Sequence, residues 1–347
     1  MQLYDEVRDQ LAGKPRRWLV TGVAGFIGSH LLEHLLVLGQ QVVGLDNFAT
    51  GYRRNIEDVL SRAGNADAFR LIEGDIRDAD TCLSACQGVD FVLHQAALGS
   101  VPRSVLDPAL YHQVNVDGTV NMLIAARDAG VRRFVYASSS AVYGDSPELP
   151  KCEPVIGEPV SPYGLTKRVG EEYAAMFRRV WGFESIGLRY FNVFGRRQEP
   201  RSAYAAVIPQ WIRKLVLGMP CEIHGDGETT RDFCYIDNVV QANLLAAAGS
   251  IRGEDRVFNV GCGERTSLND LFATIRAGLA GMRPELAGVQ ARHVDFRVGD
   301  IRHSQADISR IRAALAYEPT HLLAQGIDET LEWYVEMLSA SPDRITV

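Results

Sequence analysis

Short apolar runs alternate with longer amphipathic stretches from residue 18 to about residue 190. The runs have the length of buried strands and are bounded by turn residues. We expect strands over Trp18–Thr21, Val42–Asp46, Phe69–Glu73, Phe91–Gln95, Phe134–Ser138 and Ser185–Tyr190. Apolar residues at helical spacing predict helices over Ser29–Leu38, Thr119–Ala129 and Lys167–Arg178. This alternation is typical of a parallel sheet covered on both faces, so the sequence predicts an α/β fold with a Rossmann-type, doubly wound sheet.

The pattern changes after Tyr190, where loops rich in Gly, Pro and Arg separate shorter elements. We expect helices over Ala206–Leu217, Ser267–Leu279 and Phe233–Ala247, and a strand over Val257–Val260. The helix over Phe233–Ala247 and the strand over Val257–Val260 could pack on the large sheet, although they follow residue 190 in the chain. The sequence therefore predicts a first domain over residues 1–190, with a return at about 233–262, and a smaller, loop-rich second domain over residues 191–347.

Composition narrows the classes of function. The 347 residues are 46% hydrophobic and 23% charged, which is ordinary for a globular protein. A net charge of −7 argues against nucleic acid as a partner, because a protein that binds the phosphate backbone normally has a basic face. The six cysteines form no C-x-x-C pair, so no metal site is expected. With no signal peptide and no apolar run near the ~18 residues of a membrane span, we expect a cytoplasmic protein with no membrane partner.

Three glycines mark a candidate dinucleotide site. Gly22, Gly25 and Gly28 follow the first predicted strand and open the first predicted helix. Glycine permits the tight turn and the close approach of backbone to a pyrophosphate, and the helix N-terminus supplies amide donors. The strand and helix on either side make this pattern a predicted dinucleotide loop rather than a simple turn.

Acidic residues after the next two strands indicate which dinucleotide is bound. Asp46 ends the second predicted strand, where its carboxylate can accept hydrogen bonds from the adenosine ribose and would repel a 2′-phosphate. NAD is therefore favoured, while the nearby Arg53 and Arg54 leave NADP open. Asp75, after the third strand, is expected either to contact the adenine or to cap a helix.

Tyr163 and Lys167 form a candidate catalytic pair. They are four residues apart and lie on one face if their segment is helical. A free phenol has a pKa of about 10, and a nearby ammonium together with an oxidised nicotinamide would favour the phenolate. The serines 138–140 end the fifth predicted strand, and ligands of open α/β sheets bind outside the carboxyl ends of the strands. Together these residues predict a base with a hydroxyl partner beside the cofactor.

The order of motifs along the chain resembles the nucleotide-sugar epimerases of the extended short-chain dehydrogenase/reductase class, and within them the UDP-N-acetylglucosamine 4-epimerases of bacterial surface-polysaccharide pathways. The motifs span nearly the whole chain: TGVAGFIGS, LDNFATG, GDIRD, HQAALGSVPRS, YASSSAVYG, SPYGLTK, LRYFNVFGRRQ, GDGETTRDFCYI and RVGDIRHS.

The resemblance implies a reaction and residue roles. Tyr163 removes the proton of the sugar 4-hydroxyl while hydride passes from carbon 4 to tightly bound NAD, and its return to the opposite face makes the reaction redox-neutral. Lys167 holds the nicotinamide ribose and lowers the pKa of the phenol, and Ser139 is the hydroxyl partner. The other implied cofactor contacts are Gly22, Gly25, Phe26, Ile27, Gly28, Asp46, Asn47, Thr50, Gly51, Asp75, Ile76, Gln95, Ala96, Ala97, Asn115, Tyr190 and Val193.

The resemblance also implies a UDP-sugar site. The expected diphosphate and nucleotide contacts are Asn192, Arg231, Arg297, Asp300, Ala206, Val207 and Trp211, and the expected sugar pocket is lined by Gly99, Ser100, Ser139, Ser140, Tyr163 and Gln198. Ser304 stands where relatives restricted to unsubstituted sugars often carry Tyr, so the small side chain leaves room for a 2-acetamido group. UDP-N-acetylglucosamine is the expected substrate, with a UDP-uronate or UDP-glucose as alternatives.

Other functions on the same fold are less well matched. A nucleotide-sugar dehydratase typically needs an Asp-Glu pair, and a uronate decarboxylase commonly a Glu, where this chain has Ser140-Ala141. A net dehydrogenase or reductase would need exchangeable cofactor, and a non-catalytic NAD-binding module would not need Tyr163, Lys167 and the serine run. Helices around Ser104–Ala129 and Ser161–Val180 are expected, from the resemblance, to pair two chains through a four-helix bundle.

Overall fold

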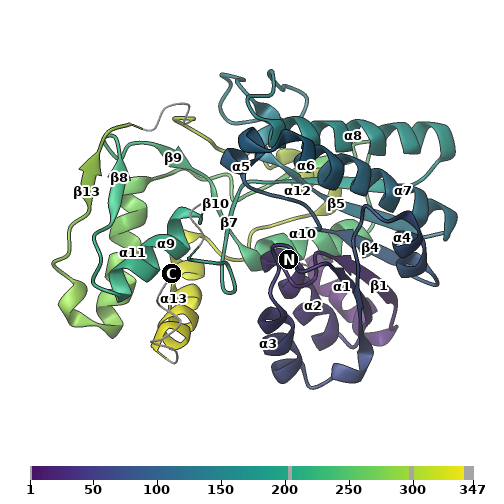
Figure 1. Cartoon of the computed structure of the whole chain (residues 1–347), viewed down its shortest axis with the longest axis horizontal. Helices are drawn as coiled ribbons and strands as arrows, with labels where there is room; N and C mark the ends of the chain where they lie inside the picture. Colours follow the sequence, from purple (N-terminus) through teal and green to yellow (C-terminus); the bar gives the residue numbers. More distant parts are fainter. Residues whose placement is uncertain (1, 202–204, 297–300, 340–347) are drawn as a thin grey trace.

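The computed structural model describes residues 2–201, 205–296 and 301–339 and brings the apolar runs together in one seven-stranded parallel sheet (Figure 1). In spatial order its strands are β11 (Val257–Val260), β6 (Ser185–Tyr190), β5 (Arg133–Ser139), β4 (Phe91–His94), β1 (Arg17–Thr21), β2 (Gln41–Asp46) and β3 (Phe69–Glu73). Each strand that the pattern predicted is present, and the doubly wound α/β fold is confirmed.

The central strands are buried because helices cover both faces of the sheet. In β1, Trp18, Leu19 and Val20 have no exposed surface, and the indole ring of Trp18 lies 4.7 Å from the ring of Phe91 on β4. A continuous apolar run of this kind is what a strand buried on both faces requires. The indole NH of Trp18 donates to the Gln40 side chain at 3.1 Å, so its polar atom is satisfied.

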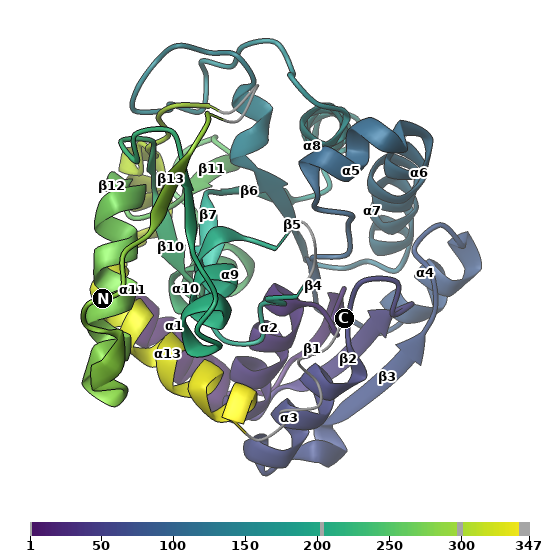
Figure 2. The same cartoon turned by 60° about the vertical axis from the view of Figure 1, so that its left-hand side comes forward.

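Two groups of helices form the outer layers (Figures 1 and 2). One face is covered by α1 (Gln2–Gly13), α2 (Phe26–Val37), α3 (Arg53–Ala63) and α10 (Ile236–Ala248). The other is covered by α4 (Ala79–Cys86), α7 (Gly118–Asp128) and α8 (Pro162–Trp181), with α5 (Val101–Leu106) and α6 (Pro108–His112) against α8. A π-helical turn over Gln113–Asp117 joins α6 to α7.

Two helices extend beyond their predicted bounds. The first predicted helix, expected from Ser29, begins at Phe26, because the amide of Ser29 already donates to the carbonyl of Gly25. The third, expected over Lys167–Arg178, is the 20-residue α8. The Ser161 hydroxyl accepts from the Gly164 amide at its start, and Gly182, with φ of +64°, ends it. Apolar spacing detects the buried middle of a helix better than its caps.

The rest of the chain packs beside the sheet layer. It contains α9 (Val207–Val216), α11 (Leu268–Met282), α12 (Ser309–Leu315) and α13 (Leu323–Ser339). Its strand pairs are β7 (Asn192–Phe194) with β10 (Phe233–Tyr235), β8 (Glu222–His224) with β13 (Arg292–Val294), and β9 (Thr230–Arg231) with β12 (Thr266–Ser267). Short 3₁₀ turns cover Ala66–Ala68, Ser140–Tyr143 and Pro284–Leu286.

The helix predicted over Phe233–Ala247 is wrong in its first three residues. Phe233, Cys234 and Tyr235 pair with β7 as a buried strand, and α10 begins only at Ile236. A short, fully buried strand and the start of a buried helix have the same apolar composition, so periodicity does not separate them. After α10, β11 pairs in parallel with β6 at the edge of the large sheet. The division of the chain at residue 190 into two domains stays a prediction.

A buried ion pair fastens α8 to the sheet. Arg189 on β6 donates two hydrogen bonds to the carboxylate of Glu171 on α8, at 2.9 and 2.7 Å, and the Ser138 hydroxyl at the end of β5 donates to the same carboxylate. Removing one partner of such a pair typically costs about 3–5 kcal/mol, because the other charge is left buried and unpaired. The pair therefore fixes the position of α8 over the carboxyl end of β5.

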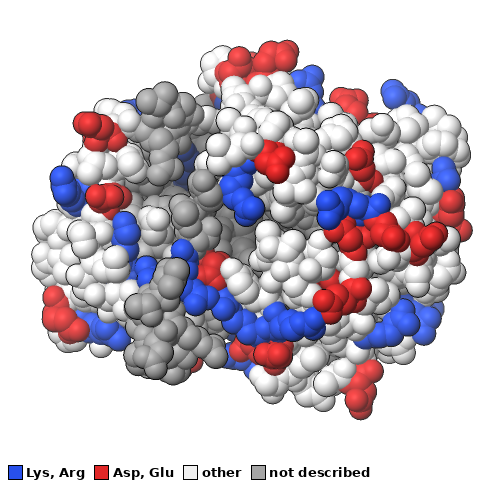
Figure 3. All heavy atoms as spheres, viewed as in Figure 1, with Lys and Arg blue, Asp and Glu red and all other residues white. Residues whose placement is uncertain are grey.

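The surface carries charges of both signs. On the face shown in Figure 3, acidic and basic side chains stand side by side, and a short row of basic side chains crosses the middle. Within the described part of the chain, no helix is both long enough and apolar enough to cross a membrane.

Candidate active site

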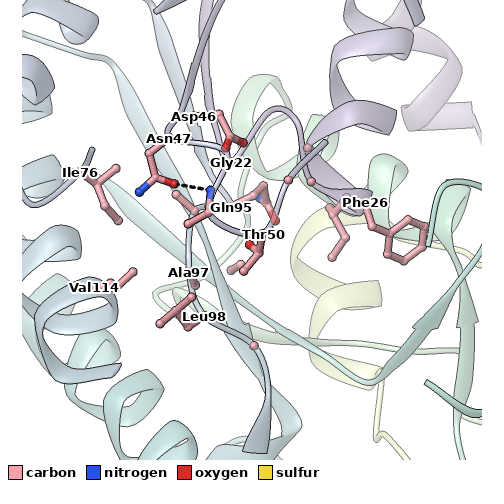
Figure 4. Close-up of a pocket in the computed structure, with 18 of the residues that line it drawn as sticks. Gly22, Phe26, Asp46, Asn47, Thr50, Ile76, Gln95, Ala97, Leu98 and Val114 are labelled. Carbon is pink, nitrogen blue, oxygen red and sulfur yellow. Dashed lines mark hydrogen bonds between the residues drawn. The ribbon is translucent and has the colours of Figure 1, made fainter. Parts of the chain in front are cut away.

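A cavity of about 550 Å³ lies at the carboxyl ends of the central strands (Figure 4). Asp46 and Asn47 lie near Gly22 in this view, with Ile76 and Val114 on the side opposite Phe26. The predicted cofactor contacts that line it are Gly22, Gly25, Phe26, Ile27, Gly28, Asp46, Asn47, Thr50, Gly51, Asp75, Ile76, Gln95, Ala96, Ala97, Tyr163, Lys167, Tyr190 and Val193. Residues that are far apart in the sequence thus share one cavity, as expected for the switch region of a doubly wound sheet.

The glycine loop leaves no room for side chains. Gly22 has a φ of +67°, and a Cβ there would lie 2.8 Å from the amide nitrogen of Ala96. A Cβ on Gly28 would lie 2.1 Å from the carbonyl oxygen of Gly22, so α2 packs directly on the loop. The tight turn and the close packing of helix on strand therefore both require glycine.

Asp46 fixes the loop that follows β2. Its carboxylate accepts the amide of Ala24 at 2.9 Å and the amide of Phe48 at 2.8 Å. Burial raises the pKa of Asp46, and these two amide bonds act in the opposite direction. Each oxygen keeps a lone pair for a further donor, so the residue suits the two hydroxyls of a ribose. The same carboxylate disfavours a phosphate at that place.

The arginines that left NADP open are engaged elsewhere. Arg53 pairs with Glu73 and stacks 4.1 Å from the ring of Phe48. Arg54 pairs with Glu199 and stacks 4.1 Å from the ring of Tyr52. These contacts favour NAD over NADP, because neither guanidinium stands ready for a 2′-phosphate.

Asp75 is not a helix cap. The cap of α4 is Asp78, whose side chain accepts the amide of Thr81 at 2.7 Å. Asp75 lines the cavity, and its carboxylate accepts hydrogen bonds from the Arg77 guanidinium and from the side-chain amide of Asn47. The bonds from Arg77 lower the pKa of Asp75 to about 2. Of the two alternatives for Asp75, the position beside the cofactor cavity is the one that the geometry favours.

Asn115 is the one predicted cofactor contact that does not line the cavity. It lies in the π-helical turn, is buried, and uses its amide to bind both backbone groups of Leu98, at 2.8 and 3.1 Å. It also donates to the Thr166 hydroxyl on α8 at 3.1 Å. Asn115 therefore fixes the cavity wall after β4 relative to α8, and its direct contact to NAD stays a prediction.

Tyr163 and Ser139 meet at the end of β5. Both residues line the first cavity, and the Ser139 hydroxyl oxygen accepts the amide of Ala141 at 3.1 Å. Burial raises the pKa of Tyr163, and the nearby Ser139 hydroxyl acts in the opposite direction. The protein alone therefore does not lower the pKa of the phenol, and the expected fall requires the charge of the bound cofactor.

Lys167 lies one helical turn after Tyr163. Its ammonium nitrogen is 5.9 Å from the centre of the Tyr163 ring and donates to the carbonyl of Ala137 at 2.8 Å. Burial lowers the pKa of Lys167 to about 8, and the nearby Glu171 carboxylate opposes this shift. The ammonium keeps two further donors for cofactor hydroxyls. This arrangement fits a nicotinamide ribose between Lys167 and Tyr163.

A second cavity, of about 740 Å³, adjoins the first and shares Gly99 and Val193 with it. Of the predicted substrate contacts, it is lined by Gly99, Ser100, Asn192, Ala206, Val207, Trp211 and Arg231. Ser139, Tyr163 and Gln198 line the first cavity. The predicted substrate residues thus fall on both sides of the junction between the two cavities.

Some predicted substrate residues lie elsewhere. Ser140 and Ser304 line neither cavity, although the Ser304 amide donates to the carbonyl of Thr230, next to Arg231. Arg297 and Asp300 lie outside the described residues. The roles predicted for these four residues stay predictions.

The sequence analysis missed residues that define the site. Gln210, Lys214 and His224 line the second cavity, and Arg103 lines the first. Glu171, behind Ser138 and Lys167, was also missed. Its place four residues after Lys167 was an available signal, because it puts both side chains on one face of the helix.

Comparisons with known proteins agree with this geometry. The sequence model of the NAD dependent epimerase/dehydratase family matches residues 18–261. A UDP-glucose 4-epimerase of Mycolicibacterium smegmatis is 41% identical over 320 residues, covering 92% of this chain and 98% of that protein. UDP-glucuronate 4-epimerase 3 of Arabidopsis thaliana is 32% identical over 342 residues, covering 91% of this chain and 76% of that protein.

A solved structure is also similar. It is a UDP-N-acetylglucosamine 4-epimerase of Methanobrevibacter ruminantium in complex with UDP-N-acetylmuramic acid, with a TM-score of 0.85 at 36% identity, covering 93% of this chain and 99% of that one. The chain belongs to the NAD dependent epimerase/dehydratase family. The resemblance to this family and NAD as the cofactor are confirmed.

The glycine loop provides a first test. Gly28→Ala places a methyl group against the Gly22 carbonyl, so we expect NAD binding to weaken at least about tenfold, measured by titration of NAD-free protein. Gly281→Ala is the matched control, because a Cβ there has no atom within 4 Å. Equal affinity in both variants would contradict the account of the loop.

Proposed function

We propose that this protein is a UDP-sugar 4-epimerase. The observation that carries the proposal is that Ser139, Tyr163 and Lys167 line the dinucleotide cavity together, and that a second cavity adjoins it at Gly99 and Val193. A sugar at that junction would have its reacting carbon between the cofactor and a base. The two sequence relatives and the solved structure named above are 4-epimerases of UDP-sugars, which supports the same reaction here.

The reaction needs a reversible proton transfer at the 4-hydroxyl. When bound between Lys167 and the glycine loop, NAD would supply the hydride acceptor, and then the hydride donor, for carbon 4. Tyr163 takes the hydroxyl proton and gives it back, Ser139 donates a hydrogen bond at the reacting oxygen, and Lys167 holds the cofactor ribose and favours the phenolate. Because burial raises the pKa of Tyr163 in the protein alone, the positive charge of the oxidised nicotinamide is needed to make it a base.

The finer proposal is that the sugar is N-acetylglucosamine, interconverted with N-acetylgalactosamine. It rests on the small Ser304 and on similarity to a solved UDP-N-acetylglucosamine 4-epimerase. A UDP-uronate and UDP-glucose are the alternatives, because relatives named for these sugars cover nearly as much of the chain. Use of the product in polysaccharide assembly and a place in the cytoplasm stay predictions.

We further propose a homodimer through α5, α7 and α8. Apolar side chains are exposed on these helices, with exposed fractions of 76% for Leu106, 49% for Leu165 and 49% for Trp181. Exposed apolar side chains gathered on neighbouring helices suit a self-complementary interface. Light scattering should give about twice the 38.3 kDa of the chain, and a mass of one chain would contradict the proposal.

Tyr163→Phe tests the base directly. The variant keeps the ring but loses the proton acceptor, so we expect kcat to fall by about 10²–10⁴-fold with the NAD content unchanged. Tyr173→Phe, at a half-exposed position of the same helix, should keep full activity. Undiminished turnover in Tyr163→Phe would overturn the mechanism.

Ser304→Tyr tests the proposed substrate. A larger side chain should lower kcat/KM for UDP-N-acetylglucosamine about 10–200-fold relative to UDP-glucose, which lacks the acetamido group. The exposed Ser309→Tyr is the control. If the ratio of the two kcat/KM values is the same in both variants, Ser304 does not select the sugar.

A further inference from the structure

Two segments from distant parts of the chain line the dinucleotide cavity. Thr50 and Gly51 belong to the loop between β2 and α3, and Gln198 belongs to the loop after β7. Gly51 immediately precedes Tyr52, the N-cap of α3, and Arg54 lies in the first turn of that helix. Gln198 immediately precedes Glu199. Contacts between the residues just beyond the lining positions therefore join two walls of the cavity.

An inner tie joins the second loop to the helix layer. Arg197 has a φ of +63°, and its fully buried guanidinium pairs with Glu33 on α2 and, at 2.9 Å, with Asp58 on α3. The hydroxyl of Tyr334 on α13 also donates to the carbonyl of Gln198. These buried contacts hold the base of the loop in the folded protein whether or not a ligand is bound.

An outer tie joins the same loop to the start of α3. Glu199 accepts a hydrogen bond from the guanidinium of Arg54, and this guanidinium stacks 4.1 Å from the centre of the Tyr52 ring. Arg201 binds the same carboxylate, at 2.8 and 3.1 Å, and orients it. Unlike the inner tie, it is partly open to solvent, because the Arg54 side chain is 43% exposed.

We propose that Tyr52, Arg54 and Glu199 form a latch that retains NAD. NAD in the first cavity would contact Thr50 and Gly51 on one segment and lie beside Gln198 on the other, so its release requires the two segments to separate. The inner tie is buried and keeps the loop anchored, whereas the outer tie can open and close. Glu199 and Arg54 are then positioning residues, because they act on the cofactor through the loops that carry the lining residues.

The latch is expected to work over the whole useful pH range but to weaken with salt. Burial of Glu199 opposes its ionisation, yet the bonds from Arg201 and Arg54 prevail and lower the pKa of the carboxyl to about 2. The carboxylate and its arginine partners thus stay charged at any pH where the protein is assayed. A partly exposed ion pair is screened by dissolved ions, so higher ionic strength should speed NAD release.

The test measures NAD retention in the full-length protein. Arg54→Met and Glu199→Gln are purified without added cofactor, loaded with NAD and passed through a desalting column, and the NAD remaining per chain is followed with time. We expect NAD release to be at least tenfold faster than in the unsubstituted protein, and Arg54→Lys to restore part of the retention. Arg312→Met is the matched control, because Arg312 is a half-exposed arginine whose guanidinium pairs with Glu318, a residue of neither loop.

Two further readouts separate a latch from a general loss of structure. Salt should speed NAD release from the unsubstituted protein but not from Arg54→Met, and saturating NAD should return the turnover of both variants to the unsubstituted level. Retention unchanged in both variants would overturn the proposal, as would release that responds equally to salt in all proteins, or activity that added NAD does not recover. NAD retention and its response to salt are measured without a sugar, so an error in the proposed substrate would affect only the turnover readout and leave these two results unchanged.

Discussion

The site depends on the packing of α8 across the carboxyl ends of β5 and β6. The buried pair of Glu171 and Arg189 fastens the helix to β6, and the bond from Ser138 ties the same carboxylate to β5. This brings Tyr163 and Lys167 from the helix to Ser139 at the strand end. A shift of α8 by one turn, about 5 Å, would carry Tyr163 and Lys167 away from Ser139. The main role of the ion pair is therefore to position α8 on the sheet, since a buried pair by itself contributes little net stability.

The two cavities are lined by different kinds of groups, one set suited to the cofactor and the other to the proposed substrate. The first is made mainly by the loops after the sheet strands and is lined by groups that suit a dinucleotide, among them Asp46 and Lys167. The second is made mainly by the chain beyond β6 and includes the side chains of Asn192 and Arg231. Tyr163, the proposed base, lines the first cavity. A relative can therefore change its sugar through the second part of the chain while it keeps the redox machinery, and this is consistent with a family that includes relatives named for several UDP-sugars.

The sequence predicted what is local and repeated, and missed what joins distant segments. The glycine loop, Asp46 and the Tyr163–Lys167 spacing each lie within one strand, loop or helix turn, so a linear pattern suffices to find them. Cys234 shows the limit of periodicity, since a buried strand and a buried helix start share the same apolar residues. Asn115 binds Leu98, and Glu199 binds Arg54, across segments that only the tertiary structure brings together. No spacing along the chain predicts these two contacts.

The central claim is that carbon 4 of the sugar loses a hydride and regains the same hydride within one binding event, so that the hydride never exchanges with solvent. It is tested most directly with UDP-N-acetylglucosamine and UDP-glucose that carry deuterium at carbon 4, incubated with the purified protein in ordinary water without added cofactor. The account predicts that at least one of them gives the 4-epimer with the deuterium still on carbon 4. Loss of the deuterium to solvent in the epimer would contradict it.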